Sequence, residues 1–203
     1  MTPRVYTDGS EPAESGLAAS DVAFFGRDTE VALIEASMER AKAGSGAFVI
    51  LDGPPGSGRS TLLSFAAERA ASAGMAVLDA TGHESERTLP FGGALQLFEK
   101  ELERTEPGER VRLLSGAAAL ASPLLARGPH DILPDEPAPS VVHGLYRLCC
   151  HLAQTRPLLI CVDDAHVMDD PTMQLLLYLS HRLDDMPAMT LAVASKPSRL
   201  STR

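Results

Sequence analysis

The sequence contains no tryptophan and only three cysteines, and its aromatic residues make up just 4% of 203 positions. Two of the cysteines, Cys149 and Cys150, are adjacent, so the three provide neither a disulfide framework nor the spacing of a metal-binding cluster. So little cysteine is most simply explained by a reducing, cytoplasmic setting. With so few aromatic rings, the core has to be built mainly from leucine, alanine and valine.

Basic residues are also scarce, because 18 lysines and arginines stand against 27 acidic residues and give a formal net charge of −9. Domains that bind nucleic acids by themselves usually carry a basic face, so we expect no direct nucleic-acid contact by this chain. No apolar run approaches the roughly 20 residues of a membrane span, and no membrane partner is expected.

The first 21 residues are rich in Gly, Pro, Ser and acidic residues, and they lack the apolar segment of a secretory signal. This composition predicts a disordered tail over 1–21. The remaining residues, 22–203, are enough for one domain with a sizeable core.

The chain does contain a glycine-rich turn between an apolar run and a helix-forming segment. The run at 47–52 predicts a buried strand, and a helix is predicted from about residue 59 to 73. The turn and the first residues of that helix read Gly53, Pro54, Pro55, Gly56, Ser57, Gly58, Arg59, Ser60 and Thr61. Glycines let main-chain N–H groups approach a polyphosphate, and a helix N-terminus offers further N–H groups and the positive end of its dipole. This context predicts a phosphate-binding loop.

The loop departs at one position from the pattern G-x-x-x-x-G-K-S/T, because Arg59 stands where the pattern has lysine. In this interpretation Arg59 is the cation on the β- and γ-phosphates, and Ser60 offers its hydroxyl to a magnesium ion. The alternative is a glycine-rich turn between a strand and a helix that binds nothing.

A second informative stretch, 158–164, holds five consecutive apolar residues and ends in Asp163 and Asp164. The absence of alternation is typical of a strand in a parallel sheet, covered on both faces. Ligands of open α/β sheets lie at the carboxyl ends of strands, so both carboxylates should emerge beside the glycine loop. Asp163 would then hold magnesium together with Ser60, and Asp164 would polarise the attacking water. The alternative is an acidic turn that caps the next helix, a role that Asp169 and its neighbours already fill.

Apolar periodicity predicts the remaining elements in order along the chain. We expect helices at about 28–43, 59–73, 92–104, 108–121, 140–155 and 170–183, and strands at 47–52, 75–80, 158–164 and 189–195. In the helix at 108–121 the stripe expected to face inward comprises Val111, Leu114, Ala118 and Ala121, and Pro123 should end that helix. The alternation of strands and helices predicts an α/β fold with a mostly parallel sheet and right-handed crossovers.

Four motifs carry a family resemblance. They are Phe-Gly-Arg-Asp-Thr-Glu at 25–30, the glycine loop at 53–61, Leu-Pro-Phe-Gly-Gly-Ala-Leu-Gln-Leu-Phe at 89–98 and Val-Asp-Asp-Ala-His-Val-Met-Asp at 162–169. Together, from about 24 to 196, they resemble the N-terminal ATPase domain of large ATP-binding LuxR-type transcriptional regulators. That family belongs to the signal-transduction ATPases with numerous domains (STAND), within the AAA-like P-loop class.

The resemblance implies a three-layer P-loop NTPase fold and an ATP-dependent switch that controls transcription, with ATP and Mg²⁺ as cofactors. It implies that Gly26 and Arg27 lie near the base and sugar of the nucleotide, and that Lys196 stands at the position of a polar sensor. The family pattern continues with a fifth core strand, a lid, sensor repeats and a DNA-binding domain, which this sequence does not show. We therefore expect the strand at 47–52 to be an open sheet edge, which could serve self-association or contact with the other regulator domains.

The replacement of lysine by Arg59 leaves three functions to separate. Arginine is longer and planar, so a switch domain with this residue should hydrolyse ATP weakly or not at all. A non-catalytic interaction module that kept the P-loop fold but lost its nucleotide is the second. A small-molecule kinase is the third, because the loop at 53–58 also resembles that of nucleotide kinases, although no arginine-rich lid follows it.

Overall fold

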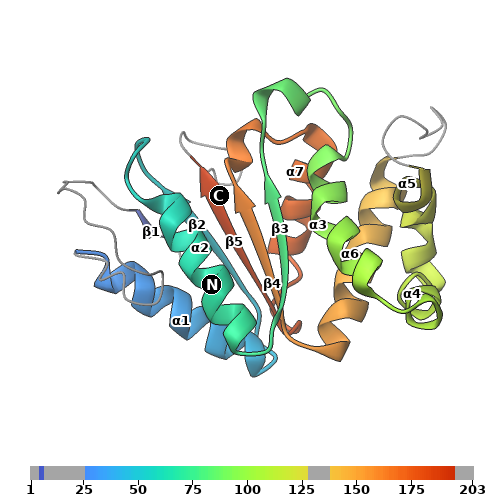
Figure 1. The fold of residues 1–203 in the computed structure, drawn as a ribbon, viewed down its shortest axis with the longest axis horizontal. Coiled ribbons are helices and arrows are strands. Elements are labelled where there is room, and N and C mark those ends of the chain that lie inside the picture. The colour runs from blue at the N-terminus through green and yellow to red at the C-terminus, as the bar shows by residue number, and fades with distance from the viewer. Residues whose placement is uncertain (1–4, 7–25, 128–137, 195–203) are drawn as a thin grey trace.

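Among the described residues, five parallel strands form the middle layer of the protein (Figure 1). The computed structural model describes residues 5–6, 26–127 and 138–194. The strands are β1 (Val5–Tyr6), β2 (Ala47–Asp52), β3 (Ala76–Thr81), β4 (Leu158–Asp163) and β5 (Ala188–Ala194). Their order in the sheet is β1-β2-β5-β4-β3, so β5 separates the strand that leads into the glycine loop from the strand that ends in the acidic pair.

Helices cover both faces of the sheet and complete a three-layer α/β sandwich. One face carries α1 (Asp28–Lys42) and α2 (Arg59–Ser72), and the other carries α3 (Gly92–Arg104), α6 (Ala138–Thr155) and α7 (Asp170–Ser180). Outside α6 lie α4 (Pro107–Leu113), the 3₁₀ turn η2 (Gly116–Ala121) and α5 (Ser122–Arg127). Two further 3₁₀ turns, η1 (Glu84–Glu86) and η3 (Ala165–Val167), lie in the connections at the carboxyl edge of the sheet.

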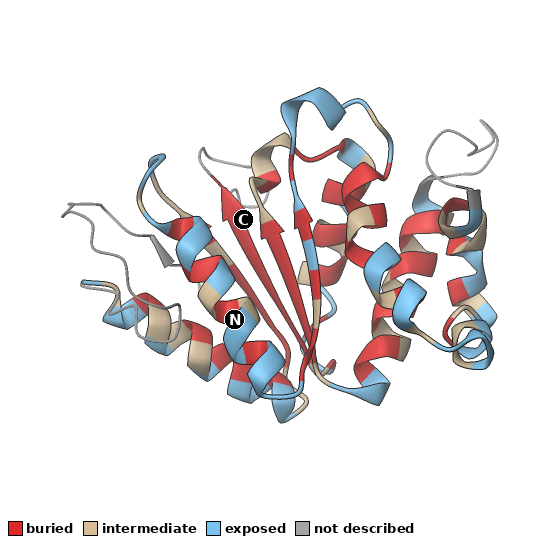
Figure 2. Cartoon of the chain, in the orientation of Figure 1, coloured by how far each residue is buried: buried red, intermediate tan, exposed pale blue. Residues whose placement is uncertain are grey.

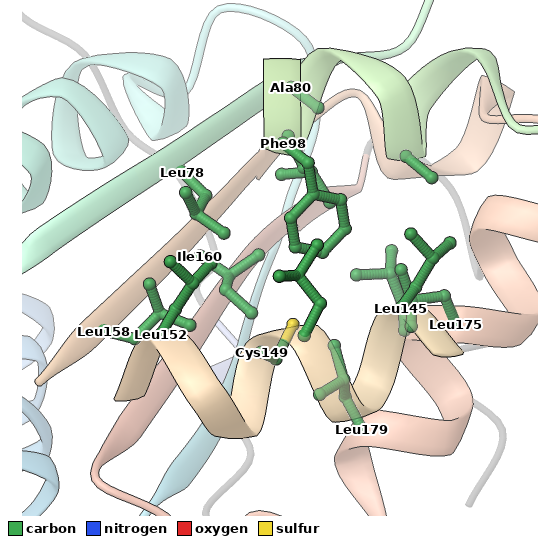
Figure 3. Packing of buried hydrophobic residues seen from close by; sticks show 14 of the residues in the cluster. Leu78, Ala80, Phe98, Leu145, Cys149, Leu152, Leu158, Ile160, Leu175 and Leu179 are labelled. Atoms are coloured by element: carbon green, nitrogen blue, oxygen red, sulfur yellow. The ribbon is translucent and has the colours of Figure 1, made fainter. Parts of the chain in front are cut away.

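Alternate strand residues divide between two hydrophobic clusters, as the period of a strand requires. On β4, Ile160 packs with the α3, α6 and α7 side, whereas Leu159 and Cys161 pack with the α1 and α2 side. Figure 3 shows the larger cluster, in which Phe98 of α3 lies among leucines of the strands and of α6 and α7. Figure 2 shows that the central strands are buried along most of their length. Burial on both faces explains why β4 reads as an unbroken apolar run.

The helix predicted over 108–121 is wrong as one element. The structure has α4, η2 and α5 in its place, with Val111 72% exposed and Pro123 inside α5 instead of at a helix end. The break falls at Ser115, which is extended, and Gly116, which has a positive φ of 60°. The turn that follows packs closely on α6, where a Cβ on Gly144 would lie 2.6 Å from the nitrogen of Ala121. This close packing of η2 on α6 accompanies the break in place of one continuous helix.

The expectation of an open edge at β2 is corrected at the carboxyl end of that strand. Val5 and Tyr6, which the sequence placed in the tail, pair in parallel with Leu51 and Asp52. The backbone groups of β2 at this end therefore have a neighbouring strand in place of an unpaired edge. The other residues of the tail predicted over 1–21 lie outside the described part of the chain.

Among the helices that the structure describes, none combines the length and the apolar character that crossing a membrane would require.

Candidate functional site

The carboxyl ends of β2, β5 and β4 lie next to one another along one edge of the sheet (Figure 1). In the strand register Asp52 is opposite Ala194, and Val162 is opposite Ala192. Because β5 alone separates β2 from β4, the start of the glycine loop and Asp163 are two strand spacings apart, about 10 Å. The two halves of the site therefore emerge at the same edge.

The glycine loop leaves the N-terminus of α2 open to an anion. Gly56 and Gly58 have φ values of 80° and 75°, and a Cβ on either would meet no atom within 4 Å. Gly58 is the N-cap of α2, no side chain of the described residues caps that helix, and its first turn contains no acidic residue. The first N–H groups and the positive end of the α2 dipole are thus available to a phosphate.

Hydroxyl groups lie within this loop and at the start of the helix. Ser57 Oγ is buried and no described residue forms a hydrogen bond with it, whereas the Ser57 N–H donates to the carbonyl of Pro54 at 3.3 Å. Ser60 and Thr61, in the first turn of α2, are exposed. A buried hydroxyl without a protein partner is what a ligand oxygen would complete, because buried polar groups normally have a partner.

The structure shows a contact of Arg59 that the motif does not reveal. The side chain is buried, with 6% of the residue exposed, and its Nη1 donates to the carbonyl oxygen of Ala194 at the end of β5. Its guanidinium therefore links the first turn of α2 to the strand beside it. The sequence analysis instead places the Arg59 guanidinium on the β- and γ-phosphates of a nucleotide. Experiments on Arg59 variants can distinguish this position from the one beside the Ala194 carbonyl.

Arg27 contacts the glycine loop itself. Its Nη2 donates to the carbonyl oxygen of Ser57, and its Nη1 lies 2.8 Å from Oε1 of Glu30, which is 5% exposed. Gly26, with a φ of 74°, is exposed beside it. The family resemblance implies that Gly26 and Arg27 lie near the base and sugar of a nucleotide, which stays a prediction. The sequence analysis missed Glu30, whose i, i+3 spacing from Arg27 is a usable signal.

The acidic pair is fixed by backbone hydrogen bonds. Asp163 accepts at Oδ1 from the N–H of Asp164 at 2.9 Å, and its carbonyl accepts from the N–H of Gly82 at 3.0 Å. Asp164 has a φ of 45°, and its side chain is 46% exposed. His166 Nδ1 lies 3.8 Å from Oδ1 of Asp164, an ion pair only when the ring is protonated. Both carboxylates are thus partly exposed at the sheet edge.

Asp169 caps α7, as the sequence predicts, and also does more. Its side chain accepts from the N–H of Thr172 at 2.9 Å, and further N–H donors come from Phe91 at 2.8 Å and Gly93 at 3.1 Å. The last two belong to the start of α3, which is 76 to 78 positions away in the chain. Sequence reasoning had identified both motifs, at 89–98 and 162–169, without the contact that joins them.

The cysteines are packing residues. Burial raises the pKa of the Cys149 thiol, with a further contribution from Cys150, and raises the pKa of Cys161 to about 12, with a further contribution from Asp79. Thiols with raised pKa values are poor nucleophiles at neutral pH.

The residues at the sheet edge fit a magnesium–nucleotide complex. Within the described residues there is no group of three or more His, Cys, Asp or Glu side chains that could hold a metal ion by themselves. Magnesium bound with a nucleotide needs less, because one or two carboxylates are combined with phosphate oxygens and water. These parts would come from the open α2 N-terminus, the space beside Gly56 and Gly58 and the carboxylate of Asp163. Lys196, the predicted sensor, lies outside the described residues.

Comparison with known proteins identifies the family of this chain. The model of the AAA ATPase domain matches residues 23–193. A search of curated proteins found no significant match. A solved structure titled "Structure of the Aeropyrum Pernix ORC2 protein (ADPNP-ADP complexes)" aligns with a TM-score of 0.44 and 19% identity. The alignment covers 85% of this chain and 42% of that one, so this chain spans less than half of that protein. Because the family model matches most of its length, the chain belongs to the AAA ATPase domain family, whose P-loop fold binds nucleotide and typically Mg²⁺.

Proposed function

We propose that this chain is the ATP-binding switch domain of a LuxR-type STAND transcriptional regulator in which ATP hydrolysis is slow or impaired. The observation that carries the proposal is the uncapped N-terminus of α2, which opens at the same sheet edge as Asp163 and Asp164. The four motifs that resemble the regulators support the finer assignment. Such a domain would act in the cytoplasm and would control transcription through other regulator domains, since its charge of −9 disfavours direct contact with nucleic acid.

The residues of the site take complementary roles in this proposal. Main-chain N–H groups from Gly56 to Thr61 would surround the phosphates, and Ser57 Oγ would gain a partner there. Ser60 and Asp163 would hold Mg²⁺, directly or through water. Bound Mg²⁺ would neutralise charge on the β- and γ-phosphates. Asp164, whose carboxylate is half-exposed, would orient and polarise the attacking water.

The contact of Arg59 supports the impaired hydrolysis. To reach a γ-phosphate, the guanidinium has to leave the carbonyl of Ala194, or share itself between the two oxygens. A charged phosphate attracts it more strongly than a neutral carbonyl, so binding can be retained. The planar group cannot reproduce the compact point charge of a lysine, however, and an error of about 1 Å in position can cost about a hundredfold in rate.

The contact of Arg27 suggests how the bound state is transmitted. Through Ser57 and Glu30, Arg27 joins the glycine loop to the first turn of α1. A loop that closes on a nucleotide would therefore move or stiffen the N-terminal helix as well. This coupling is what a switch needs, because a ligand shifts only those states with which it interacts differently.

Isothermal titration with ATP, in Mg²⁺ and in EDTA, tests the proposal on wild type, Arg59→Lys, Ser60→Ala and Asp163→Asn. We expect Mg²⁺-dependent binding by wild type, faster hydrolysis by Arg59→Lys, and loss of the Mg²⁺ dependence in Ser60→Ala and Asp163→Asn. Glu68→Gln, an exposed change on α2 away from the loop, is the matched control. Absence of ATP binding in wild type and in Arg59→Lys would overturn the proposal.

A non-catalytic interaction module is the second candidate, and the bond from Arg59 to Ala194 favours it. In a module of this kind the guanidinium is a permanent structural link, and Arg59→Lys would weaken the fold without creating nucleotide binding. A shift in the melting temperature on addition of MgATP counts against this candidate, because a ligand specific for the folded state stabilises it.

A further inference from the structure

Two connections at the carboxyl edge of the sheet are joined at both of their ends. One runs from β3 to α3, over 82–91, and the other runs from β4 to α7, over 164–169. The second connection carries Asp164 and begins directly after Asp163. Contacts that hold the first connection in place therefore also affect the position of Asp163 and Asp164.

The inner junction is a backbone contact at Gly82. Its N–H donates to the carbonyl of Asp163 at 3.0 Å, continuing the β3–β4 pairing that ends with Thr81 opposite Asp163. A Cβ on Gly82 would lie 2.4 Å from the carbonyl oxygen of Asp164 and 2.9 Å from Cγ2 of Val167. Only glycine allows the two connections to approach so closely.

The outer junction is built on the carboxylate of Asp169, which is 3% exposed. Its Oδ1 accepts from Phe91 N at 2.8 Å and from Thr172 N at 2.9 Å, and its Oδ2 accepts from Gly93 N at 3.1 Å and Thr172 Oγ1 at 2.7 Å. The same Thr172 hydroxyl accepts from Ala94 N at 2.9 Å. One carboxylate thus caps two helices, α3 and α7, and uses both oxygens to do so.

The backbone between the junctions is strained. In the described part of the chain, the non-glycine residues with positive φ are Phe91, at 63°, and Asp164, at 45°. One lies in each of the joined connections. Residues other than glycine stay in this region only where the surroundings hold them there, and such strain concentrates at functional sites.

We propose that Asp169, with Thr172, is a positioning residue of the nucleotide site that holds the Asp163–Asp164 turn in its working geometry. Asp169 touches no reacting atom and acts through the backbone. It fixes the start of α3, so that the 82–91 connection is held at both of its ends. Gly82, at the other end of this connection, then keeps the Asp163 carbonyl and the left-handed backbone of Asp164 in place. The functional half of this inference rests on the proposed function, whereas the mechanical half does not.

A helix cap for α7 alone would not need this arrangement. The bond from Thr172 N is sufficient for that purpose, yet two of the four bonds to Asp169 come from the start of α3. The four donors also approach both oxygens, a demand that a carboxylate meets and the single oxygen of asparagine does not. Conservative replacements of Asp169 and Thr172 can therefore distinguish a role in joining the two connections from a role in capping α7 alone.

The test compares Asp169→Asn, Thr172→Val and Thr172→Ser with wild type. Leu148→Ala, which creates a cavity in the core at α6, is the control for a loss of stability that does not involve the junction. The first readout is amide hydrogen exchange resolved by NMR without nucleotide. We expect Asp169→Asn and Thr172→Val to accelerate exchange at Phe91 and Gly93 and also at Gly82 and Asp164, which Asp169 does not touch, with Thr172→Ser close to wild type.

The second readout is the Mg²⁺ concentration at half-maximal ATP binding. Loss of a supporting contact around a metal ligand typically costs about 10- to 100-fold in metal affinity, so we expect a rise of about tenfold in Asp169→Asn and none in Leu148→Ala. Faster exchange at Phe91 and Gly93 with unchanged exchange at Gly82 and Asp164 would overturn the positioning role. If wild type binds no MgATP while exchange spreads as expected, the proposed function fails and the mechanical junction stands.

Discussion

The two halves of the site are held in different ways. The glycine loop is largely exposed, and two arginine side chains link it and the start of α2 to other parts of the chain: Arg27 donates to the Ser57 carbonyl, and Arg59 donates to the Ala194 carbonyl. The acidic half is backed by the buried carboxylate of Asp169. A guanidinium can exchange a neutral carbonyl for a charged phosphate oxygen as its partner, whereas a buried carboxylate with four donors cannot give them up without leaving them unsatisfied. We infer that the glycine-loop half can rearrange and that the acidic half is built in advance.

The largest expected effect comes from removing the support of the acidic half. Asp169→Ala leaves the N–H groups of Phe91, Gly93 and Thr172 without their acceptor, so the free energy of unfolding should fall by about 3 kcal/mol. Urea denaturation followed by circular dichroism measures the change. Ser60→Ala, at the open half, should change it by less than about 0.5 kcal/mol. Equal losses in the two variants would remove the contrast between the halves.

A smaller effect is expected from adding a methyl group to each half. Gly82→Ala should destabilise the protein by about 2 kcal/mol, because its Cβ would overlap the Asp164 carbonyl oxygen. Gly56→Ala meets no atom within 4 Å, so only its positive φ opposes the change, at a cost of about 1 kcal/mol. Thermal unfolding of both variants checks the order, and a larger loss in Gly56→Ala would contradict it.

Arg59→Lys sharpens the comparison on the loop side. A lysine that does not reproduce the bond to the Ala194 carbonyl lowers stability by about 1 kcal/mol. Under the proposed function the same change raises the rate of ATP hydrolysis, measured by phosphate release, because the amine fits the phosphates as a point charge. A stable Arg59→Lys variant with an unchanged melting temperature would show that the bond to Ala194 contributes little.

The last comparison concerns the sheet that both halves share, and its effect is absent at neutral pH and appears only in alkali. The folded-state pKa of Cys161 is raised from 9.0 to about 12, so its contribution to stability is complete below pH 9 and is lost as the pH rises toward 12. One such thiol costs about 1.4 kcal/mol per pH unit in that range. Urea midpoints from pH 7 to 11 should fall less in Cys161→Ala than in wild type. Parallel slopes for the two proteins would refute this origin of the alkaline loss.

The sequence predicted the elements of the site well, since each is a local pattern. The strand at 47–52 and the helix at 92–104 have the predicted bounds, and Asp169 caps α7 as expected. The roles of Ser60, Asp163 and Asp164 stay predictions. The helix at 108–121 failed because periodicity alone was followed across Ser115 and Gly116, a pair that breaks the backbone.

What the sequence determined by itself is the order of strands, helices and glycine loop, because period and turn chemistry act between neighbouring residues. The fold class followed from that order. Only the tertiary structure decided that Arg59 reaches a carbonyl 135 positions away, that Asp169 caps a second helix 78 positions away, and that β1 pairs with β2. These contacts arise when packing brings distant backbone groups together and their buried donors and acceptors must find partners, which no local pattern records.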